Sequence, residues 1–363
     1  MGCARKCFEE GGCCYRCLQI VRWLPVLFVF SILAWAYYAY VIQLCFLTVE
    51  NAIERSFYLF GFHLFFVLLI WSYCATVFAK LHKPPSQFFL PVEILNDVKN
   101  SAGDDKRIAQ ILQRYAAQEK LPIRMRSYDG GGQFLRYCPK CHCLKPDRSH
   151  HCSMCGQCIL KFDHHCPWVN TCVNYHNYKF FLHFLGYGIA LCLFGFLTDM
   201  QYFIRFWKND IHEGRTDVGK FHMLFLFFVS GMFSLSLGGL FFYHLYLVAR
   251  NRTTIESFRP PMLSAGEDKH AFNMGIRANF RQVFGPRPLF WFLPVYSSEG
   301  DGVTVDCSSY QTLPFEMTCI LPDEPTADVP ADVIFTKPSM HTATDSSSTP
   351  LSNSNISPGS GMV

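Results

Sequence analysis

The sequence predicts an α-helical multi-pass membrane protein with four transmembrane helices and a cytosolic, cysteine-rich zinc-binding domain between the second and the third. Composition and cysteine spacing carry this prediction. Half of the 363 residues are hydrophobic and only 17% are charged, which is unusual for a soluble protein. Between Cys138 and Cys172, in the polar stretch that separates the second and third apolar blocks, there are eight cysteines and five histidines.

The apolar residues form four blocks, each long enough to cross a bilayer as a helix of about 20 residues. They run approximately over 24–47, 57–78, 180–206 and 223–248. The first block follows a polar, cysteine-rich tail and lacks a small-residue cleavage site, so it does not resemble a cleaved signal peptide. Lysine and arginine are frequent in both tails and in the long loop between the second and third blocks. The positive-inside tendency therefore places both termini and this loop in the cytosol.

Regions of different composition flank the spans. An amphipathic helix is expected over 104–120, and a second helix with one apolar face over 272–284. The expected order is a cytosolic cysteine-rich tail (1–20), the first two spans (21–80), a cytosolic linker (81–134), the cysteine-rich domain (135–180), the last two spans (181–249), a cytosolic region (250–320) and a disordered tail rich in Ser, Thr and Pro (321–363).

The cytosolic placement decides how the 18 cysteines are interpreted, because cytosolic thiols stay reduced and their clusters indicate metal binding or catalysis. Five cysteines in the N-terminal tail lie among basic residues near the membrane. Reversible acylation with palmitate, which would make the chain a lipoprotein, is one interpretation, and unmodified thiols are the other. These residues are Cys3, Cys7, Cys13, Cys14 and Cys17.

The loop between the second and third blocks repeats one pattern, a Cys-x2-Cys pair followed by a histidine and a further cysteine. Three thiolates and one imidazole complete the tetrahedral shell of a structural zinc ion and leave no open position. We therefore expect two structural zinc ions, which would supply much of the folding free energy of so small a region. The first would be held by Cys138, Cys141, His151 and Cys158, and the second by Cys152, Cys155, His165 and Cys172.

Cys166 is not needed by either zinc ion and stands beside an acid–base pair. An ordinary cysteine thiol titrates near about 8.5, so it needs a base to become a nucleophile at neutral pH. His164 can take the proton, and Asp163 can hold that imidazole in the required tautomer. We interpret Cys166 as a catalytic nucleophile; the alternative is a spare zinc ligand.

The third span begins soon after Cys166, so the thiol is expected at the cytosolic face of the bilayer. An acyl thioester whose chain lies among the helices suits such a thiol, and the reaction would be ping-pong transthioesterification from a long-chain acyl-coenzyme A. Three residues before the nucleophile could bind the phosphates of coenzyme A, or could form a solvated basic face. They are Lys145, Arg148 and His150, and Trp168 is assigned to the same site.

The stretch from Cys138 to Phe181, with Asp-His-His-Cys at 163–166, resembles the DHHC protein S-acyltransferases, or palmitoyltransferases. Thr253-Thr254-Ile255-Glu256 is similar to the TTxE motif of that family, and Asn279 to an asparagine in its C-terminal motif. The resemblance covers the four spans and is strongest to the subgroup of members two, fifteen and twenty. It implies the same zinc ligands and catalytic residues, a supporting role for Thr254 near Asp163, and packing of the C-terminal helix on the spans by Asn279.

The resemblance also implies an acyl cavity lined by Ala36, Phe181, Phe184 and Leu191. Ala36 and Leu191 stand where some relatives have Ser and Tyr, which predicts a deeper cavity that accepts chains longer than palmitate. Other departures are Cys143, which could compete for zinc or be buried, and Thr171, Asn174 and His176 in the stretch after the tetrad, where Asn174 replaces a glycine.

The implied partners are the bilayer, acyl-coenzyme A and membrane-proximal protein substrates with cysteines, and no nucleic acid. Resemblance to the subgroup implies the Golgi or the plasma membrane. Two alternatives compete with the enzyme: a membrane-anchored zinc module that only recruits partners, and a channel or transporter. The second would need ionisable residues within the spans, for which His63, His183 and Asp199 are the candidates.

Overall fold

The computed structural model describes residues 13–129, 132–208 and 217–305, and all of these belong to one compact unit. The predicted acylation sites Cys3 and Cys7 lie outside the described residues, as do the side chains of the other tail cysteines and the tail predicted to be disordered.

Among the described residues, four helices are long and apolar enough to cross a membrane, which agrees with the predicted four spans. The first span joins α2 (Cys13–Tyr37) to a π-helix, η1 (Tyr38–Phe46); the others are α3 (Ala52–Val77), α6 (Tyr178–Trp207) and α7 (Asp217–Ala249). The stretches that fit the bilayer are Gln19–Phe46, Ala52–Val77, Tyr178–Arg205 and Gly219–Ala249. Large apolar side chains on them are exposed, which suits contact with lipid.

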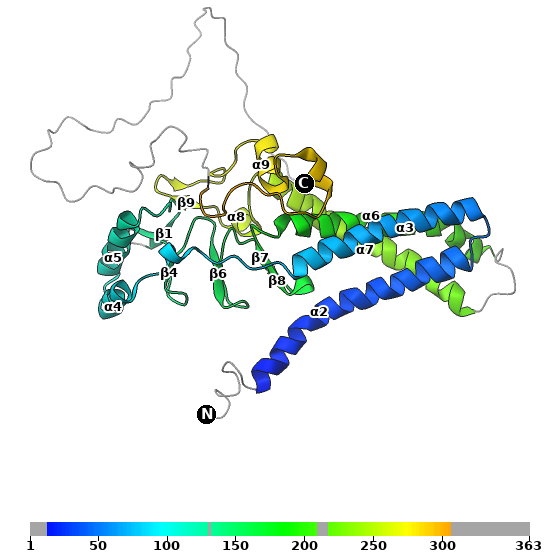
Figure 1. Cartoon of the computed structure of the whole chain (residues 1–363), viewed down its shortest axis with the longest axis horizontal. Helices are drawn as coiled ribbons and strands as arrows, with labels where there is room; N and C mark the ends of the chain where they lie inside the picture. The colour runs from blue at the N-terminus through cyan, green and yellow to red at the C-terminus, as the bar shows by residue number, and fades with distance from the viewer. Residues whose placement is uncertain (1–12, 130–131, 209–216, 306–363) are drawn as a thin grey trace, which may run out of the picture. The chain divides into compact units, whose positions relative to one another are not determined.

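Among the membrane-spanning helices, α6 packs against both α3 and α7, and the three lie side by side (Figure 1). Two glycines of α6 permit the close approach of α7. A Cβ atom at Gly188 would lie 3.1 Å from Leu237, and one at Gly186 would lie 3.3 Å from Phe241. Small residues at helix contacts are typical of membrane bundles. These glycines therefore serve close packing of α6 against α7.

The π-helix η1 was not predicted from the sequence. It places Tyr40, which is fully buried, in a stacked contact with Phe62 at 4.3 Å between ring centroids. The Tyr40 hydroxyl is 2.8 Å from the hydroxyl of Thr198 on α6. Tyr40 of η1 thus connects the first span to the second span through Phe62 and to the third span through Thr198. Hydropathy could not reveal η1, because α- and π-helices share the same apolar composition.

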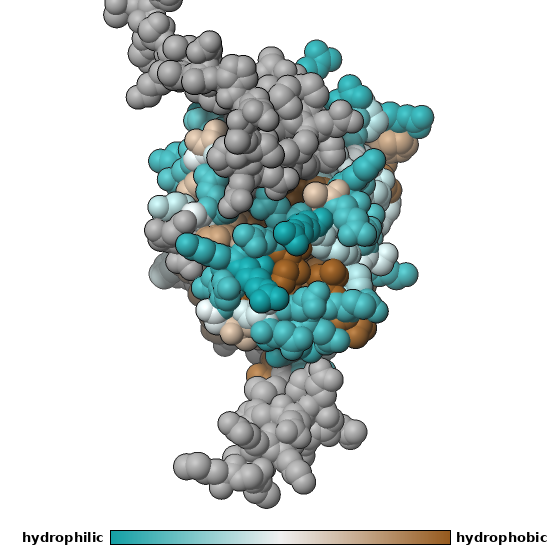
Figure 2. Space-filling view, turned by 90° about the vertical axis from the view of Figure 1, so that its left-hand side faces the viewer, coloured by the Kyte–Doolittle hydropathy of each residue, from teal (hydrophilic) through white to brown (hydrophobic). Residues whose placement is uncertain are grey.

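The linker after the second span contains η2 (Ser86–Phe88), α4 (Val92–Asn100) and α5 (Asp105–Gln118). Helix α5 confirms the predicted amphipathic helix, and Asp104 caps its first turn through the backbone N–H of Arg107. Its buried side chains pack in one cluster with Leu144 and Leu160, so α5 lies on the cysteine-rich domain. Viewed from the side of α4 and α5, the surface is largely hydrophilic (Figure 2), as expected for a part that faces water.

The cysteine-rich domain is a chain of short antiparallel hairpins. The paired strands are β1 (Arg126–Asp129) with β2 (Gly132–Leu135), β3 (Tyr137–Cys138) with β4 (Cys143–Leu144), β5 (His150–Cys152) with β6 (Gln157–Ile159), and β7 (His164–Cys166) with β8 (Thr171–Val173). The 3-10 helix η3 (Pro167–Val169) connects the last two strands. Hairpins this short do not form an extended sheet, so other contacts must hold them in place.

After the fourth span the chain forms α8 (Thr254–Phe258), the hairpin β9 (Met262–Leu263) with β10 (Gly266–Glu267), α9 (Ile276–Phe284) and η4 (Pro288–Phe292). Helix α9 begins later than predicted, because Gly275 at φ 92° ends the preceding turn in a conformation that favours glycine. Val283 and Phe284 of α9 are buried against Leu182 and Val248. This segment therefore folds back onto the third and fourth spans.

Candidate active site and metal centres

The first group of metal-ligating side chains is the predicted one, Cys138, Cys141, His151 and Cys158, with all four ligand atoms within 4.8 Å of one another. The three sulfur atoms lie 3.5, 3.2 and 4.0 Å from the Nδ1 of His151. Ligand atoms around a tetrahedral zinc ion would be separated by about 3.6 Å. The donor set and its spacing therefore fit zinc.

The second group is also the predicted one, Cys152, Cys155, His165 and Cys172. Its sulfur atoms lie 3.7, 3.5 and 3.5 Å from the Nδ1 of His165. Both groups could hold a structural zinc ion in a closed shell. The β5–β6 hairpin contributes to both of them, since His151 and Cys158 belong to the first site and Cys152 and Cys155 to the second.

The strand β7 carries a predicted metal ligand on one face and the predicted catalytic residues on the other. Side chains alternate between the two faces of a strand. His165 points to the second zinc site, whereas His164 and Cys166 share the opposite face. On that face Cys166 is buried in a cluster with Phe181 of the third span and Tyr73 of the second. The predicted nucleophile therefore lies against the spans.

Asp163 is held from two sides. Its Oδ2 atom is 2.6 Å from Nδ1 of His164 and accepts a hydrogen bond of 2.7 Å from the hydroxyl of Thr254. Its Oδ1 atom accepts a hydrogen bond of 2.8 Å from the backbone N–H of Thr254. The carboxylate is 1% exposed. With Nδ1 of His164 directed at Asp163, only its Nε2 is free to exchange a proton with a thiol.

These contacts shift both pKa values. Burial alone would raise the pKa of Asp163, but the hydrogen bond and positive charge of His164 lower it below its usual value. Burial alone would lower the pKa of His164, but the hydrogen bond to Asp163 and the nearby Cys166 raise it to about 9. An imidazole of this basicity takes a proton from an ordinary thiol at little cost, because a thiol titrates near about 8.5.

A pH dependence of stability follows from the raised pKa. The Asp163–His164 pair is expected to contribute its full stabilisation below about pH 6.5 and to lose it as the pH rises through about 9, since the unfolded imidazole titrates lower than the folded one. The thermal unfolding midpoints of the wild type and of His164→Gln, with zinc present, should therefore converge between pH 6.5 and pH 9.5. An equal difference at both pH values would contradict the pairing.

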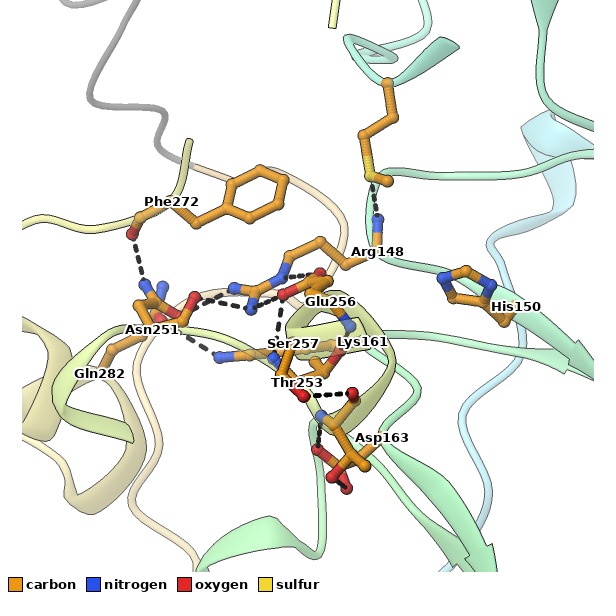
Figure 3. A network of polar contacts seen from close by, with 12 residues as sticks. Arg148, His150, Lys161, Asp163, Asn251, Thr253, Glu256, Ser257, Phe272 and Gln282 are labelled. Atoms are coloured by element: carbon orange, nitrogen blue, oxygen red, sulfur yellow. Dashed lines mark hydrogen bonds and ion pairs between the residues drawn. The ribbon is translucent and has the colours of Figure 1, made fainter. Parts of the chain in front are cut away.

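Thr254 is positioned by a buried network around Arg148 (Figure 3). Thr253 and Glu256 form a capping box that starts α8. The guanidinium of Arg148 binds both carboxylate oxygens of Glu256, at 2.8 and 2.7 Å, and the side-chain oxygen of Asn251 at 2.8 Å. It also lies 4.4 Å from the ring centroid of Phe272. The network therefore ties the cysteine-rich domain to the segment that follows the fourth span.

The burial of Arg148 changes its expected role. Its guanidinium is 0% exposed and its N–H groups are used by Glu256 and Asn251. A phosphate of coenzyme A has no access to it, so the structure assigns Arg148 to this internal link in place of the predicted phosphate contact. A basic residue with its partner some hundred positions away looks solvent-exposed in the sequence, which explains the error.

The other residues assigned to coenzyme A lie in different surroundings. His150 is largely buried near Arg136 and Phe162; burial, followed by the positive charges of Arg136 and Lys145, lowers its pKa to about 3, so it offers a neutral ring. Lys145 keeps part of its surface exposed. Trp168 is 53% exposed beside the first span, and its carbonyl accepts a hydrogen bond from Tyr73.

The four side chains assigned to the acyl cavity lie among the spans. Phe181 packs in the cluster of Cys166, and Phe184 touches both this cluster and the next one. That second cluster contains buried Leu191, with Ala36 packed against it. These residues thus follow one another from the nucleophile into the bundle.

Two departures from the family pattern have a structural outcome. Cys143 is fully buried next to Cys138 and Cys158 and belongs to neither ligand group. Asn174 keeps a negative φ, so the lost glycine does not strain the backbone. The Asn174 side chain accepts the N–H of His176 and donates to the carbonyl of Cys172, which closes the turn.

Asn279 lies where the resemblance implied. It is 1% exposed and donates to the carbonyl of Ala249 at the end of α7, which joins α9 to the fourth span. Other contacts were not visible in the sequence. His244 of α7 lies with Asp163 and His164, although no motif includes it. The sequence held one signal for Glu256. Its spacing of three residues from Thr253 is typical of a capping box at the start of a helix.

The hydroxyl of Thr254 gives a testable contribution. Thr254→Val keeps the shape of the side chain and the backbone hydrogen bond, but removes the donor to Oδ2 of Asp163. We expect acylation of Cys166 to slow about tenfold, because hydrogen bonds to a charged group contribute about 1.5–3 kcal/mol. Thr304→Val, at an exposed position far from Asp163 in the sequence, is the matched control. Equal rates in both variants would contradict the assignment.

Comparison with known proteins agrees with this geometry. The sequence model of the family described as "DHHC palmitoyltransferase" matches residues 132–260. Palmitoyltransferase ZDHHC2 of Danio rerio is 48% identical over 295 residues, which cover 81% of this chain and 79% of the relative. Palmitoyltransferase ZDHHC20 of Homo sapiens is 47% identical over 292 residues, covering 79% and 78%. Palmitoyltransferase ZDHHC15 of Xenopus laevis is 45% identical over 288 residues, covering 79% and 82%. With four spans and a Cys/His-rich domain between the second and the third, the chain belongs to the DHHC palmitoyltransferase family, as its motifs predicted.

Proposed function

We propose that this acyltransferase moves a long-chain acyl group from acyl-coenzyme A to its own Cys166, and then to cysteines of membrane-associated proteins. The observation that supports this most is the arrangement of β7. Cys166 shares a face with His164, whose ring is oriented by Asp163, and it lies against Phe181 of the third span. A base and a bilayer-embedded helix thus meet at one thiol.

The proposed chemistry is thioester exchange in two halves. Nε2 of His164 accepts the proton of Cys166, and the thiolate attacks the carbonyl carbon of the acyl thioester. The bond to the coenzyme A sulfur breaks, and the departing thiolate takes the proton from His164. In the second half a substrate cysteine gives its proton to His164 and attacks the carbonyl carbon of the acyl group. The bond to the Cys166 sulfur breaks, and the departing Cys166 thiolate takes the proton back from His164.

Zinc, when bound at the two Cys/His groups, supplies structure rather than reactivity, since neither group has an open position. Pinning His165 fixes β7, and with it the direction of His164 and Cys166. Among the residues assigned to coenzyme A, Lys145 is the cation proposed for its phosphates, and Trp168 and His150 are proposed as further contacts of the same molecule. Phe181, Phe184, Leu191 and Ala36 are proposed to contact the acyl chain.

The substrate partners proposed are proteins whose cysteines lie close to the cytosolic face of the membrane, because the depth of Cys166 beside the spans restricts access to such thiols. The excess of Lys and Arg in the tails and the long loop supports a cytosolic location of both termini and of the cysteine-rich domain. Resemblance to the subgroup supports residence in the Golgi or the plasma membrane.

The decisive experiment uses the purified, zinc-loaded full chain in detergent or lipid with labelled palmitoyl-coenzyme A. We expect a hydroxylamine-sensitive adduct on the wild type, no adduct on Cys166→Ser, and an unchanged adduct on Cys143→Ser, a buried cysteine outside both ligand groups. Zinc content is measured in each sample, so that loss of chemistry is separated from unfolding.

No adduct on the wild type, or the same adduct on Cys166→Ser, would contradict the proposal. The first result would favour a zinc module that only recruits partners, for which the Asp163–His164 pair has no use. A transporter finds less support, since His63 and His183, two of its three candidate residues, bind the backbone carbonyls of Leu59 and Trp291. Only Asp199, which is buried and has no hydrogen-bond partner among the described residues, remains as a candidate.

Chain length gives a separate prediction. With Ala36 and Leu191 at the end of the proposed cavity, we expect stearoyl-coenzyme A to acylate Cys166 within about threefold of the palmitoyl rate. Leu191→Tyr is expected to slow the stearoyl reaction at least about tenfold more than the palmitoyl reaction. The stearoyl chain is longer by a pair of methylene groups, and each methylene group that no longer fits its pocket costs about 1–3 kcal/mol. A sharp fall beyond palmitate in the wild type would contradict the deeper cavity.

A further inference from the structure

A second imidazole, that of His244, lies beside the catalytic pair. It comes from α7 in the fourth span and is 2% exposed. A carboxylate oxygen of Asp163, a ring nitrogen of His164 and a ring nitrogen of His244 all lie within 4.8 Å of one another. The centroids of the two imidazole rings are 5.9 Å apart. The fourth span therefore reaches the reacting groups with a polar side chain.

The ring of Phe181 packs edge-on against both imidazoles. Its centroid is 5.5 Å from that of His164, at 72°, and 5.1 Å from that of His244, at 81°. The three rings form one contact group on the face of β7 that carries Cys166. His164 is thus bounded by Phe181 and His244, while Asp163 holds its Nδ1.

Tyr178, the first residue of α6, fixes the orientation of His244. The Tyr178 hydroxyl is 3.0 Å from Nδ1 of His244, and its backbone N–H donates to the carbonyl of Asn174 at 3.0 Å. Asn174 in turn binds the carbonyl of the zinc ligand Cys172. The position of His244 is therefore set by the same turn that follows the second zinc site.

An imidazole in a membrane span is costly unless it serves a purpose. At this position a phenylalanine would pack against Phe181 without burying any polar atom. His164 has 31% of its side chain exposed and is anchored to Asp163 through Nδ1, so the direction of the rest of the ring depends on the side chains packed against it. A displacement of about 1 Å at a reacting group costs up to about 100-fold in rate.

We propose that His244, oriented by the hydroxyl of Tyr178, is a positioning residue that keeps the His164 ring directed at Cys166. This inference rests on the proposed role of Cys166 as the acyl acceptor. In this role His244 acts on the thiol indirectly, through its contacts with His164 and Phe181. Tyr178 and His244 are expected to work as one unit, since the hydroxyl has its effect only through the imidazole.

The test compares His244→Phe and Tyr178→Phe, singly and together, with His222→Phe and Tyr246→Phe on α7 as controls for the same two types of substitution. Tyr178→Phe removes a single oxygen, so it keeps the test decisive if His244→Phe fails to fold. His244→Gln, which retains an acceptor for Tyr178, is expected to fall between His244→Phe and the wild type. Zinc content is measured throughout.

Two rates are measured on the full, zinc-loaded chain. The first is acylation of Cys166 as a function of palmitoyl-coenzyme A concentration. We expect each single variant to lower the limiting rate about tenfold, with the half-saturating concentration changed less than about twofold, and the double variant to be no slower than the slower single one. The second is alkylation of Cys166 by iodoacetamide, followed by peptide mass spectrometry, which should slow in the same variants.

Rates equal to those of the controls would overturn the inference, as would a change in the half-saturating concentration alone or additive losses in the double variant. The alkylation rate does not depend on acyl transfer. Absence of an acyl adduct on the wild type would therefore refute the proposed function, whereas unchanged alkylation in His244→Phe would refute the positioning role.

Discussion

Replacing Asp163 with asparagine is expected to lower the rate of Cys166 acylation by about 1,000- to 10,000-fold while both zinc ions stay bound. In the wild type both carboxylate oxygens of Asp163 accept hydrogen bonds. The donors are the ring of His164 and the hydroxyl and backbone N–H groups of Thr254. An amide presents N–H groups on one side. It would donate to Nδ1 of His164, leave the proton on Nε2, and deprive Cys166 of its base. An Asp-to-Asn change in a catalytic triad lowers the catalytic rate by a factor of this size for the same reason.

The measurement is the single-turnover rate of adduct formation with labelled palmitoyl-coenzyme A. Asp97→Asn, at an exposed position on α4, is the control for the substitution itself. Zinc content and the thermal unfolding midpoint show whether the variant is folded. A rate within about tenfold of the wild type would mean that Asp163 does not set the tautomer of His164.

Loss of one zinc site is expected to remove the other. The β5–β6 hairpin carries ligands of both sites, so Cys158→Ser in the first site should release the strand that holds Cys152 and Cys155 in the second. Binding of structural zinc contributes about 10–16 kcal/mol in small domains, more than the short hairpins can replace. We expect the zinc content to fall from two ions per chain to near zero and the acyl adduct to disappear.

Cys143→Ser is the matched control for that experiment. Cys143 is buried beside Cys158 and pairs across the strands with Cys138, but it belongs to neither ligand group. Zinc measured by atomic emission should stay at two ions per chain in this variant. Retention of one zinc ion in Cys158→Ser would show that the sites fold independently.

The parts of the structure that the sequence predicted are those whose signal is local. Four spans follow from hydropathy, and both zinc groups follow from the spacing of Cys and His along short hairpins. Asp163, His164 and Cys166 are close in sequence, so their meeting on one strand needed no knowledge of the rest of the fold. Helix α5 followed from its apolar period in the same way.

The parts that it could not predict depend on docking between distant segments. Arg148 looked like a surface cation because Glu256, its partner, follows two membrane spans later in the chain. His244 carries no motif and gains its place only when α7 packs against α6. The π-helix η1 is invisible to hydropathy, and it carries the packing of Tyr40 against Phe62 of the second span.

The contact between Thr254 and Asp163 has a consequence for the order in which the enzyme becomes active during its synthesis. The ribosome makes all four spans and the cysteine-rich domain before it reaches Thr254 and Glu256. A nascent chain can therefore enter the membrane and bind metal while its catalytic carboxylate still lacks the partners that anchor it. We therefore expect a chain that ends before Thr254 to be inactive even with its four spans complete, because the two donors that anchor Asp163 are missing from it.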